Sequence, residues 1–243
     1  MDKMLFVAMS GARETMHSMA ANSNNLANVN TTGFKADFNQ FRSQQVYGPG
    51  YESRAYAMSE RPAIDLSAGT MVQTGRNLDI AVATDGFIAV QAPQGGEAYT
   101  RKGNMRVNQV GQLLTGSGLP VMGDDGPIAL PPGKVTIGVD GSVSVSPLDG
   151  GGDVLIDRIK LVRPEAKNID KGEDGLFRTK DGVQPVADAD VTVVAGMLES
   201  SNVNVVDAMV NMISLSRHFD MQVKMMKTAE ELERSSDGLL RLG

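Results

Sequence analysis

Apolar residues recur with heptad spacing at the N-terminal end of the chain. Between residue 2 and about residue 28 they are separated by alternating intervals of four and three. This spacing predicts a helix with one apolar stripe, about three heptads long. Asp2 is a plausible N-cap, and the Asn- and Gly-rich run 28–33 ends the helix. The stripe consists of Leu5, Met9, Ala12, Met16, Met19, Ser23 and Leu26.

The C-terminal end carries a second stripe, on a helix predicted from about Val205 to about Leu240. Asn204, followed three residues later by Asp207, resembles a capping box at its start. Apolar positions again repeat at three and four, while charged residues occupy the other faces. The stripe comprises Met209, Met212, Ser216, Phe219, Val223 and Met226, and then drifts onto Ala229, Leu232, Ser236 and Leu239.

A helix with one bare apolar stripe is not stable alone in water, so both stripes require partners. One alternative is that the two helices pack on the middle of the chain. The other is that they pair with each other, in a coiled-coil-like manner, and with neighbouring copies. Matched heptads at both chain ends, separated by a segment of different character, favour the second alternative.

The middle of the chain, about 76–197, is predicted to form an antiparallel β domain. Short runs of β-forming residues alternate with glycine-containing turns. The predicted fold class is therefore α+β, with a mostly β centre between two terminal helices. The expected strands lie at 78–82, 87–90, 99–101, 112–114, 135–137, 142–145, 158–162, 176–178 and 191–194.

Residues 34–75 are predicted to be an extended connector with aromatic anchors, ordered only when packed. They contain six of the chain's eleven Phe and Tyr residues, and Gly48-Pro49-Gly50 interrupts them. The expected organisation is thus a helix with its exit turn at 1–33, the connector at 34–75, the β domain at 76–197 and the second helix at 198–243. The aromatic residues are Phe34, Phe38, Phe41, Tyr47, Tyr51 and Tyr56.

Composition argues against several classes of function. The net charge of −6 and the lack of any Lys/Arg run do not fit a nucleic-acid binder or a ligand of anionic membranes. The absence of cysteine excludes thiolate metal sites, thiol catalysis and disulfides. No stretch approaches the roughly 20 apolar residues of a membrane span. The run Met4–Met9 is too short for a secretion signal, so we expect any export to leave the N-terminus intact.

No motif for catalysis or for cofactor binding stands out. His17 and His218 lack a ligand set, and we expect them to be solvated or packed. The acidic run 170–175 with Asp181 faintly resembles a calcium loop, but it lacks flanking helix signals and is better interpreted as a hairpin turn. A pair of carboxylates brought together by the fold stays open as a glycosidase-like alternative. No cofactor and no metal is expected.

A cluster of asparagines at the end of the first predicted helix is unusual, because Asn is a poor helix former. One interpretation is a frayed helix end. The other is that the amides bond across tightly packed subunits and fix their register. The cluster comprises Asn22, Asn24, Asn25, Asn28 and Asn30.

At these residues the chain resembles the flagellar axial proteins, the rod and hook family. The segment 23–35 (SNNLANVNTTGFK) is similar to the N-terminal signature of that family. Residues 78–87 and 99–103 resemble the opening of its β domain, and residues 196–204 resemble the motif before its C-terminal helix. The matches follow the family's order over nearly the whole chain. Met1–Leu5 and 217–224 resemble a proximal-rod member, with a distal-rod member as the alternative.

The resemblance implies a self-assembling structural subunit of the basal-body rod, in the periplasm, that transmits motor torque. It implies partners among its own copies, other rod proteins and the flagellar type III export apparatus. A wall-acting enzyme and a secreted adhesin are the alternatives from other classes, but neither requires matched heptads at both ends. The expected assembly interface comprises Leu5, Met9, Ala12, Met16, Met19, Asn24, Asn25, Leu26, Asn28, Gly33, Phe34, Asn202, Asn204, Met209, Met212, Phe219, Val223, Met226 and Leu232.

Overall fold

The computed structural model describes residues 3–38, 41–45, 55–59, 63–147 and 150–240. Their contacts divide them into two compact units. The helical unit takes its described residues from Met1–Asn28, Ala36–Asp65 and Val203–Gly243. The β unit comprises Val29–Lys35 and the described part of Leu66–Asn202. The chain therefore passes between the units more than once, and each unit contains segments distant in sequence.

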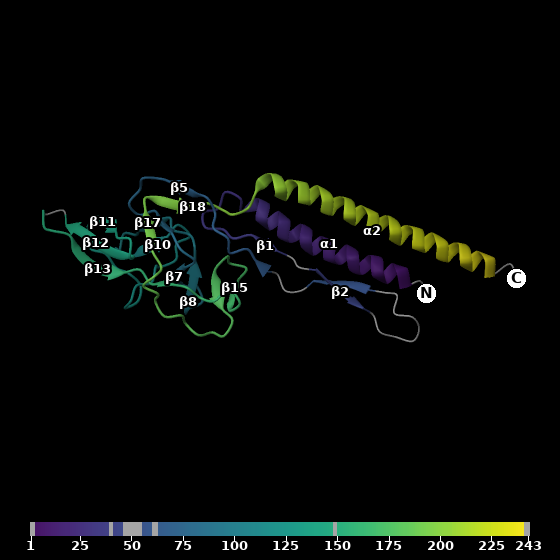
Figure 1. The fold of residues 1–243 in the computed structure, drawn as a ribbon, viewed down its shortest axis with the longest axis horizontal. Helices are drawn as coiled ribbons and strands as arrows, with labels where there is room; N and C mark the ends of the chain where they lie inside the picture. The colour runs from purple at the N-terminus through teal and green to yellow at the C-terminus, as the bar shows by residue number, and fades with distance from the viewer. Residues whose placement is uncertain (1–2, 39–40, 46–54, 60–62, 148–149, 241–243) are drawn as a thin grey trace. The chain divides into compact units, whose positions relative to one another are not determined.

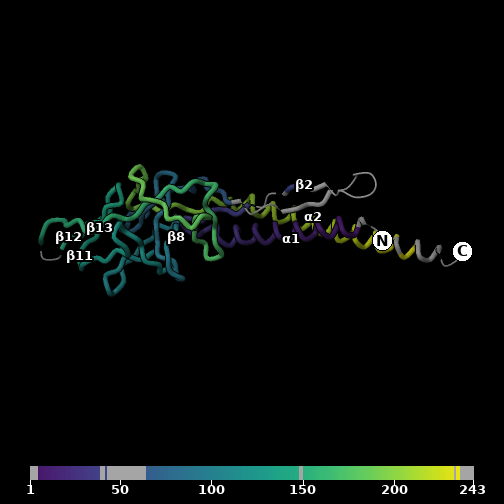
Figure 2. The backbone as a smooth tube through the Cα atoms, turned by 90° about the horizontal axis from the view of Figure 1, so that it is seen from below, coloured from purple at the N-terminus to yellow at the C-terminus, as the bar shows by residue number. Residues whose placement is uncertain are grey.

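The helical unit is built on the two terminal helices, α1 (Lys3–Ala27) and α2 (Val205–Leu240). They lie side by side in both views (Figures 1 and 2). Two strand pairs complete the unit: β1 (Asp37–Phe38) with β4 (Ala63–Ile64), and β2 (Phe41–Gln45) with β3 (Ala55–Ser59). Both helices occupy the predicted spans, and Asp2, the predicted N-cap, lies outside the described residues.

The two helices run antiparallel, because a contact farther along α1 falls nearer the start of α2. The hydroxyl of Thr15 donates to Oε1 of Gln222 at 3.1 Å, whereas the amide of Asn22 donates to the carbonyl oxygen of Ala208 at 2.7 Å. Asn204 caps the start of α2, since its Oδ1 accepts the backbone N–H of Val206 at 3.0 Å, and the return bond from Asp207 that would complete a capping box stays a prediction.

Small residues, not the methionines, form the buried side of the helices. Alanines at four positions are almost fully buried, so the elements packed on each helix can approach closely. Met9 and Met16, predicted to lie in the seam, are 54% and 58% exposed in the single chain. The buried alanines are Ala8 and Ala12 on α1, with Ala208 and Ala229 on α2.

The β unit is antiparallel throughout its described strand pairs, as predicted. Its five-stranded sheet has the order β14-β7-β8-β16-β15, and a three-stranded sheet has the order β11-β12-β13. Strands β9 and β10, β6 and β17, and β5 and β18 form pairs. The strands are β5 (Met71–Gln73), β6 (Ile80–Val82), β7 (Phe87–Gln91), β8 (Glu97–Thr100), β9 (Met105–Val107), β10 (Leu113–Thr115), β11 (Gly133–Ile137), β12 (Ser142–Pro147), β13 (Val154–Arg158), β14 (Leu161–Val162), β15 (Ile169–Lys171), β16 (Phe177–Thr179), β17 (Val193–Ala195) and β18 (Met197–Glu199).

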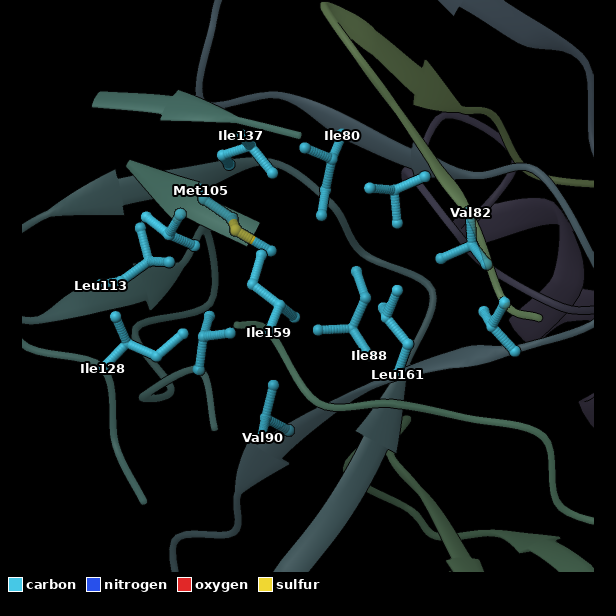
Figure 3. Packing of buried hydrophobic residues seen from close by; sticks show 14 of the residues in the cluster. Ile80, Val82, Ile88, Val90, Met105, Leu113, Ile128, Ile137, Ile159 and Leu161 are labelled. Carbon is cyan, nitrogen blue, oxygen red and sulfur yellow. The ribbon is translucent and has the colours of Figure 1, made fainter. Parts of the chain in front are cut away.

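The core of the β unit is aliphatic, and side chains from several sheets converge on it (Figure 3). Ile80, Ile88 and Leu113 are fully buried there. Ile159 also enters the core, and this corrects one expectation. The strand predicted at 158–162 is divided at this point, because Ile159 leaves the β13 sheet and β14 joins the five-stranded sheet. Period-2 patterning cannot detect such a change of sheet.

The segment predicted as an extended connector carries short strands, from β1 to β5, in the described residues. Phe34 is buried and Phe38 is 53% exposed. Tyr47 and Tyr51 lie outside the described residues, and so do the side chains of Phe41 and Tyr56. The proposed anchoring role of these four aromatics therefore stays a prediction, as do the domain limits at 33, 75 and 197.

Candidate assembly site

The chain leaves the first helix through a turn that requires glycine. Gly33 has a φ of 65°, and a Cβ placed on it would lie 2.4 Å from the backbone of Arg101. Its N–H donates to the carbonyl oxygen of Glu199 at 2.8 Å. A side chain at position 33 would thus meet both an unfavourable φ and a backbone collision. This turn brings the segment 29–35 against the strand that precedes the second helix.

Two residues after this glycine, Lys35 enters a completely buried ion cluster. Its ammonium donates to Oε1 of Glu199 at 2.6 Å and to the carbonyl oxygen of Ser67 at 2.6 Å. The guanidinium of Arg101 donates to Oε2 of the same glutamate at 3.0 Å. The side chains of Lys35 and Glu199 are 0% exposed and that of Arg101 is 4% exposed. One carboxylate therefore joins two cations from distant parts of the chain.

Backbone groups satisfy much of the remaining hydrogen-bonding capacity in this cluster. The N–H of Gly69 donates to Oε1 of Glu199 at 2.9 Å, and Arg101 donates to the carbonyl oxygen of Thr84 at 2.9 Å. Burial raises the pKa of Glu199, but the hydrogen bonds from Lys35 and Gly69 and the charge of Arg101 outweigh it. The pKa of this carboxyl consequently lies below its ordinary value, and the group is ionised.

Phe34 and Asn202 extend the same junction. The ammonium of Lys171 lies 3.9 Å from the ring centroid of Phe34 and donates to the carbonyl oxygen of Lys35 at 2.9 Å. Asn202 donates from its backbone to the carbonyl oxygen of Phe34 and from its side chain to that of Ser67, at 3.4 and 3.2 Å. These contacts fix the two segments through which the chain enters and leaves the β unit.

Within the helical unit, the asparagine cluster bonds inside the chain. The side chain of Asn25 donates to the carbonyl oxygen of Asp37 at 2.9 Å and accepts the N–H of Asp37 at 2.8 Å. Asn24 donates to the carboxylate of Asp37, while Asn28 donates back to Asn24. The helix includes Asn22, Asn24 and Asn25 and ends at Ala27, before Asn28 and Asn30, and the frayed-end interpretation stays untested. The bonds of Asn25 attach β1 to α1, and the predicted bonds between subunits stay a prediction.

A second face of α2 carries exposed apolar side chains at helical spacing. Val206, Met209, Val210 and Ile213 are 66%, 51%, 59% and 55% exposed. Their separations of three and four residues place them on one face. Ala208 lies off that face and meets Asn22 of α1. Among the described side chains of α1, the exposed large apolar ones are Leu5, Phe6, Met9 and Met16.

The expected interface residues thus differ widely in exposure. Exposure does not by itself mean that a residue lacks a partner in the chain, since Asn24 bonds to Asp37 and Asn204 caps α2. Buried are Ala12, Asn25, Gly33 and Phe34. Partly buried are Met19, Leu26, Asn28, Asn202, Met212, Phe219, Val223 and Met226. Exposed are Leu5, Met9, Met16, Asn24, Asn204, Met209 and Leu232.

Sequence reasoning did not predict the ion cluster, although a signal was present. Each of the family-like segments 23–35, 99–103 and 196–204 contributes one member: Lys35, Arg101 and Glu199. Glu199 is the single charged residue in its segment. A lone charge in an otherwise uncharged motif is a reason to look for a buried partner of opposite sign.

The described residues contain no group of three or more His, Cys, Asp or Glu that could hold a metal ion. His17 and His218 are both exposed. The acidic run 170–175 covers the end of β15 and the turn to β16, and the two strands pair as a hairpin, as predicted. Over the described part of the chain, neither helix is apolar enough over a sufficient length to span a bilayer.

Three segments of the chain match family models of flagellar axial proteins, and these matches identify the class of protein. Residues 5–35 match the family model for the flagella basal body rod protein. Residues 81–145 match that for the flagellar hook protein FlgE/F/G D1 domain. Residues 194–239 match that for the flagellar basal body rod FlgEFG protein C-terminal region. These segments carry, respectively, Lys35, Arg101 and Glu199.

Among individual relatives, the flagellar basal-body rod protein FlgF of Escherichia coli (strain K12) is 39% identical over 100% of both chains. FlgF of Salmonella typhimurium (strain LT2) is 38% identical, again over 100% of both. The rod protein FlgG of Buchnera aphidicola from Schizaphis graminum is 29% identical over 94% of this chain and 96% of its own. The chain therefore belongs to the flagellar basal-body rod protein family, as a FlgF-like member.

Proposed function

We propose that this chain is a structural subunit of the flagellar basal-body rod that assembles through its terminal helices. Family membership carries the location in the basal body and the association with other rod proteins. It also speaks against the wall-acting enzyme and the adhesin, because the relatives are rod proteins. The finer elements of the proposal are self-association, a proximal position in the rod, a periplasmic location and export by the flagellar type III apparatus without a cleaved signal.

The exposed apolar face of α2 is the observation that supports assembly through the helices. Val206, Met209, Val210 and Ile213 present a contiguous stripe to solvent, while the helix is already held on α1 by another face. A stripe of this kind costs free energy in water and is stabilised when a further helix covers it. A second copy of this chain would offer terminal helices suited to that role.

A charge in this stripe tests the proposal. Met209→Asp leaves the single chain folded, because the side chain is half exposed. On assembly the carboxylate would be buried without a partner, at a cost of several kcal/mol. We expect cells carrying Met209→Asp to lose rod completion and motility. Val139→Asp, at a 67% exposed position of the β unit, is the matched control and should remain motile. Normal rods with Met209→Asp would contradict the proposal.

The distal-rod alternative is tested by complementation. We expect the gene for this chain to restore motility to a strain lacking its FlgF and not to a strain lacking its FlgG. The reverse result would assign the chain to the distal rod, in keeping with the FlgG relatives.

A further inference from the structure

The β unit contains a groove that plays no part in the junction or in the helix contacts. It has a volume of about 580 Å³, and strands β9 and β11 form much of its wall. Its apolar side chains include Leu78, Val107 and Val135. Val107 and Val135 also line an adjoining pocket of about 280 Å³, so the depression continues along both strands. β11 is an edge strand of its sheet, and no described strand pairs with its other edge.

Three cations lie around this groove, in a chain whose net charge is −6. Arg76 is paired with Asp79 at 3.2 Å. Arg106 and Lys134 form no ion pair with any described residue. Two unpaired cations beside apolar side chains suit a chain segment that has both carboxylates and small apolar residues.

Such a segment lies elsewhere on the same unit. Residues 182–188 have no regular secondary structure, and within them Val183 and Val186 are 66% and 85% exposed. Pro185 favours an extended conformation, in which residues three apart lie on one side. Asp181 and Asp188 flank the two valines. Asp181 accepts the side-chain amide of Asn168 at 2.7 Å, and Asp188 is paired with Arg163 at 3.6 Å, so both carboxylates would exchange exposed intrachain partners for the groove cations. Among the described residues, no hydrogen bond is found for the backbone of 184–187, which leaves it available to another chain.

We infer that the 181–190 segment of one subunit binds in the β9–β11 groove of a second copy of this chain. Val183 and Val186 would cover Val107 and Val135, and the flanking carboxylates would approach Arg106 and Lys134. The unpaired edge of β11 and the backbone of residues 184–187 would then add main-chain bonds. The segment does not fill its own groove, because Val186 is exposed and no residue of 181–190 lines the groove.

The contact would join two different surfaces, so it is heterologous. A heterologous contact that does not close into a ring generates an open helical assembly, which is the form of a rod. The inference rests on the proposed function and deepens it, since it gives the β units a contact of their own besides the helices. Failure of this contact would leave assembly through the helices standing.

The absence of native cysteine allows a direct test with the full chain. Val107→Cys and Val186→Cys are prepared as separate proteins, mixed at high concentration and oxidised. We expect roughly tenfold more mixed disulfide than a mixture of Val139→Cys and Val186→Cys gives, because the contact raises the effective concentration of the two thiols. Alkylation rates of the three thiols, measured on each protein alone, correct for accessibility.

The second measurement tests whether the contact depends on the charge of the groove. Adding Arg106→Glu to the Val107→Cys protein should lower the yield of mixed disulfide to that of the Val139→Cys control, and so should high salt. Lys167→Glu, at an exposed lysine outside the groove, should leave the yield unchanged. Equal yields from the groove and control mixtures would overturn the inference, as would a high yield that resists Arg106→Glu. Neither result affects the Met209→Asp test of assembly through the helices.

Discussion

The two units of this protein differ in how much of their apolar surface they bury within one chain. The β unit encloses an aliphatic core around Ile80, Ile88 and Leu113 and holds a fully buried ion cluster. The helical unit buries alanines, while Met209, Val210 and Ile213 remain more than half exposed. The β unit can thus be stable in the free subunit, whereas the helical unit has surface whose burial requires a neighbour. If the exposed side chains of α2 are covered on assembly, as proposed above, then folding of the single chain and assembly of the rod rest on different residues.

The largest effect on the free energy of unfolding is expected from Glu199→Gln. Removing the carboxylate leaves Lys35 and Arg101 buried without a counter-charge, at a cost of about 3–5 kcal/mol. Hydrogen exchange should accelerate in the β unit first. Glu173→Gln, an exposed position in the β15–β16 turn, is the control and should change little. Unchanged exchange in the β unit would show that this cluster does not stabilise it.

Gly33→Val should cost about 2–3 kcal/mol, because the new side chain combines a positive φ with a backbone collision at Arg101. Gly75→Val is a matched control with the same kind of φ, 70°, and no atom within 4 Å of the added Cβ. Denaturant titration gives the free energy of unfolding of each variant. The difference between the two values measures the cost of the backbone collision alone. Equal destabilisation would mean that φ strain alone acts at position 33.

Asn25→Ala is expected to destabilise the helical unit by about 1–2 kcal/mol, since the two hydrogen bonds between its side chain and the backbone of Asp37 are lost. Hydrogen exchange should accelerate around β1 and β4 and stay unchanged in the β unit. Asn24→Ala, at an exposed neighbour, should have a smaller effect. If Asn25→Ala left exchange at β1 unaltered yet prevented rod completion, the predicted bonds between subunits would be favoured instead.

The smallest expected effect on the free energy of unfolding is that of low pH. The pKa of Glu199 is lower in the folded chain than in an unfolded one, so its contribution to stability is present above the unfolded pKa of about 4.3. That contribution is lost as the pH falls from about 4 through the lower folded value. We therefore expect the free energy of unfolding of the β unit to decline below about pH 4, and Glu199→Gln to flatten that decline. The same slope in wild type and variant would assign the acid sensitivity to other carboxylates.

Local pattern was sufficient to predict the elements whose limits are set by nearby residues. The C-terminal helix was predicted at Val205–Leu240 and occurs there, because a long heptad stripe and the Asn204 cap specify it without reference to the rest of the fold. The hairpin turns with glycine were predicted for the same reason. The strands predicted at 78–82, 87–90 and 135–137 match β6, β7 and β11 closely.

The limits of sequence reasoning lie where distant segments meet. Neither the division at Ile159 nor the short strands β5 and β18 could be predicted, because strand pairing between residues 71–73 and 197–199 leaves no local periodicity. The heptad spacing predicted which face of α1 and of α2 is apolar. It did not predict which residues of that face are buried within the chain. The small residues at 8 and 12 are buried within the chain, and Met9 and Met16 are left exposed.

What the sequence by itself determined is the class of protein, the two terminal helices and the β character between them, because each depends on periodicity, caps or a motif within a few residues. Only the tertiary structure decided that Lys35, Arg101 and Glu199 share one buried site and that Asn25 holds Asp37. The tertiary structure also decided which apolar side chains stay exposed in the single chain. Those outcomes depend on contacts between residues up to 164 positions apart, and no local pattern encodes them.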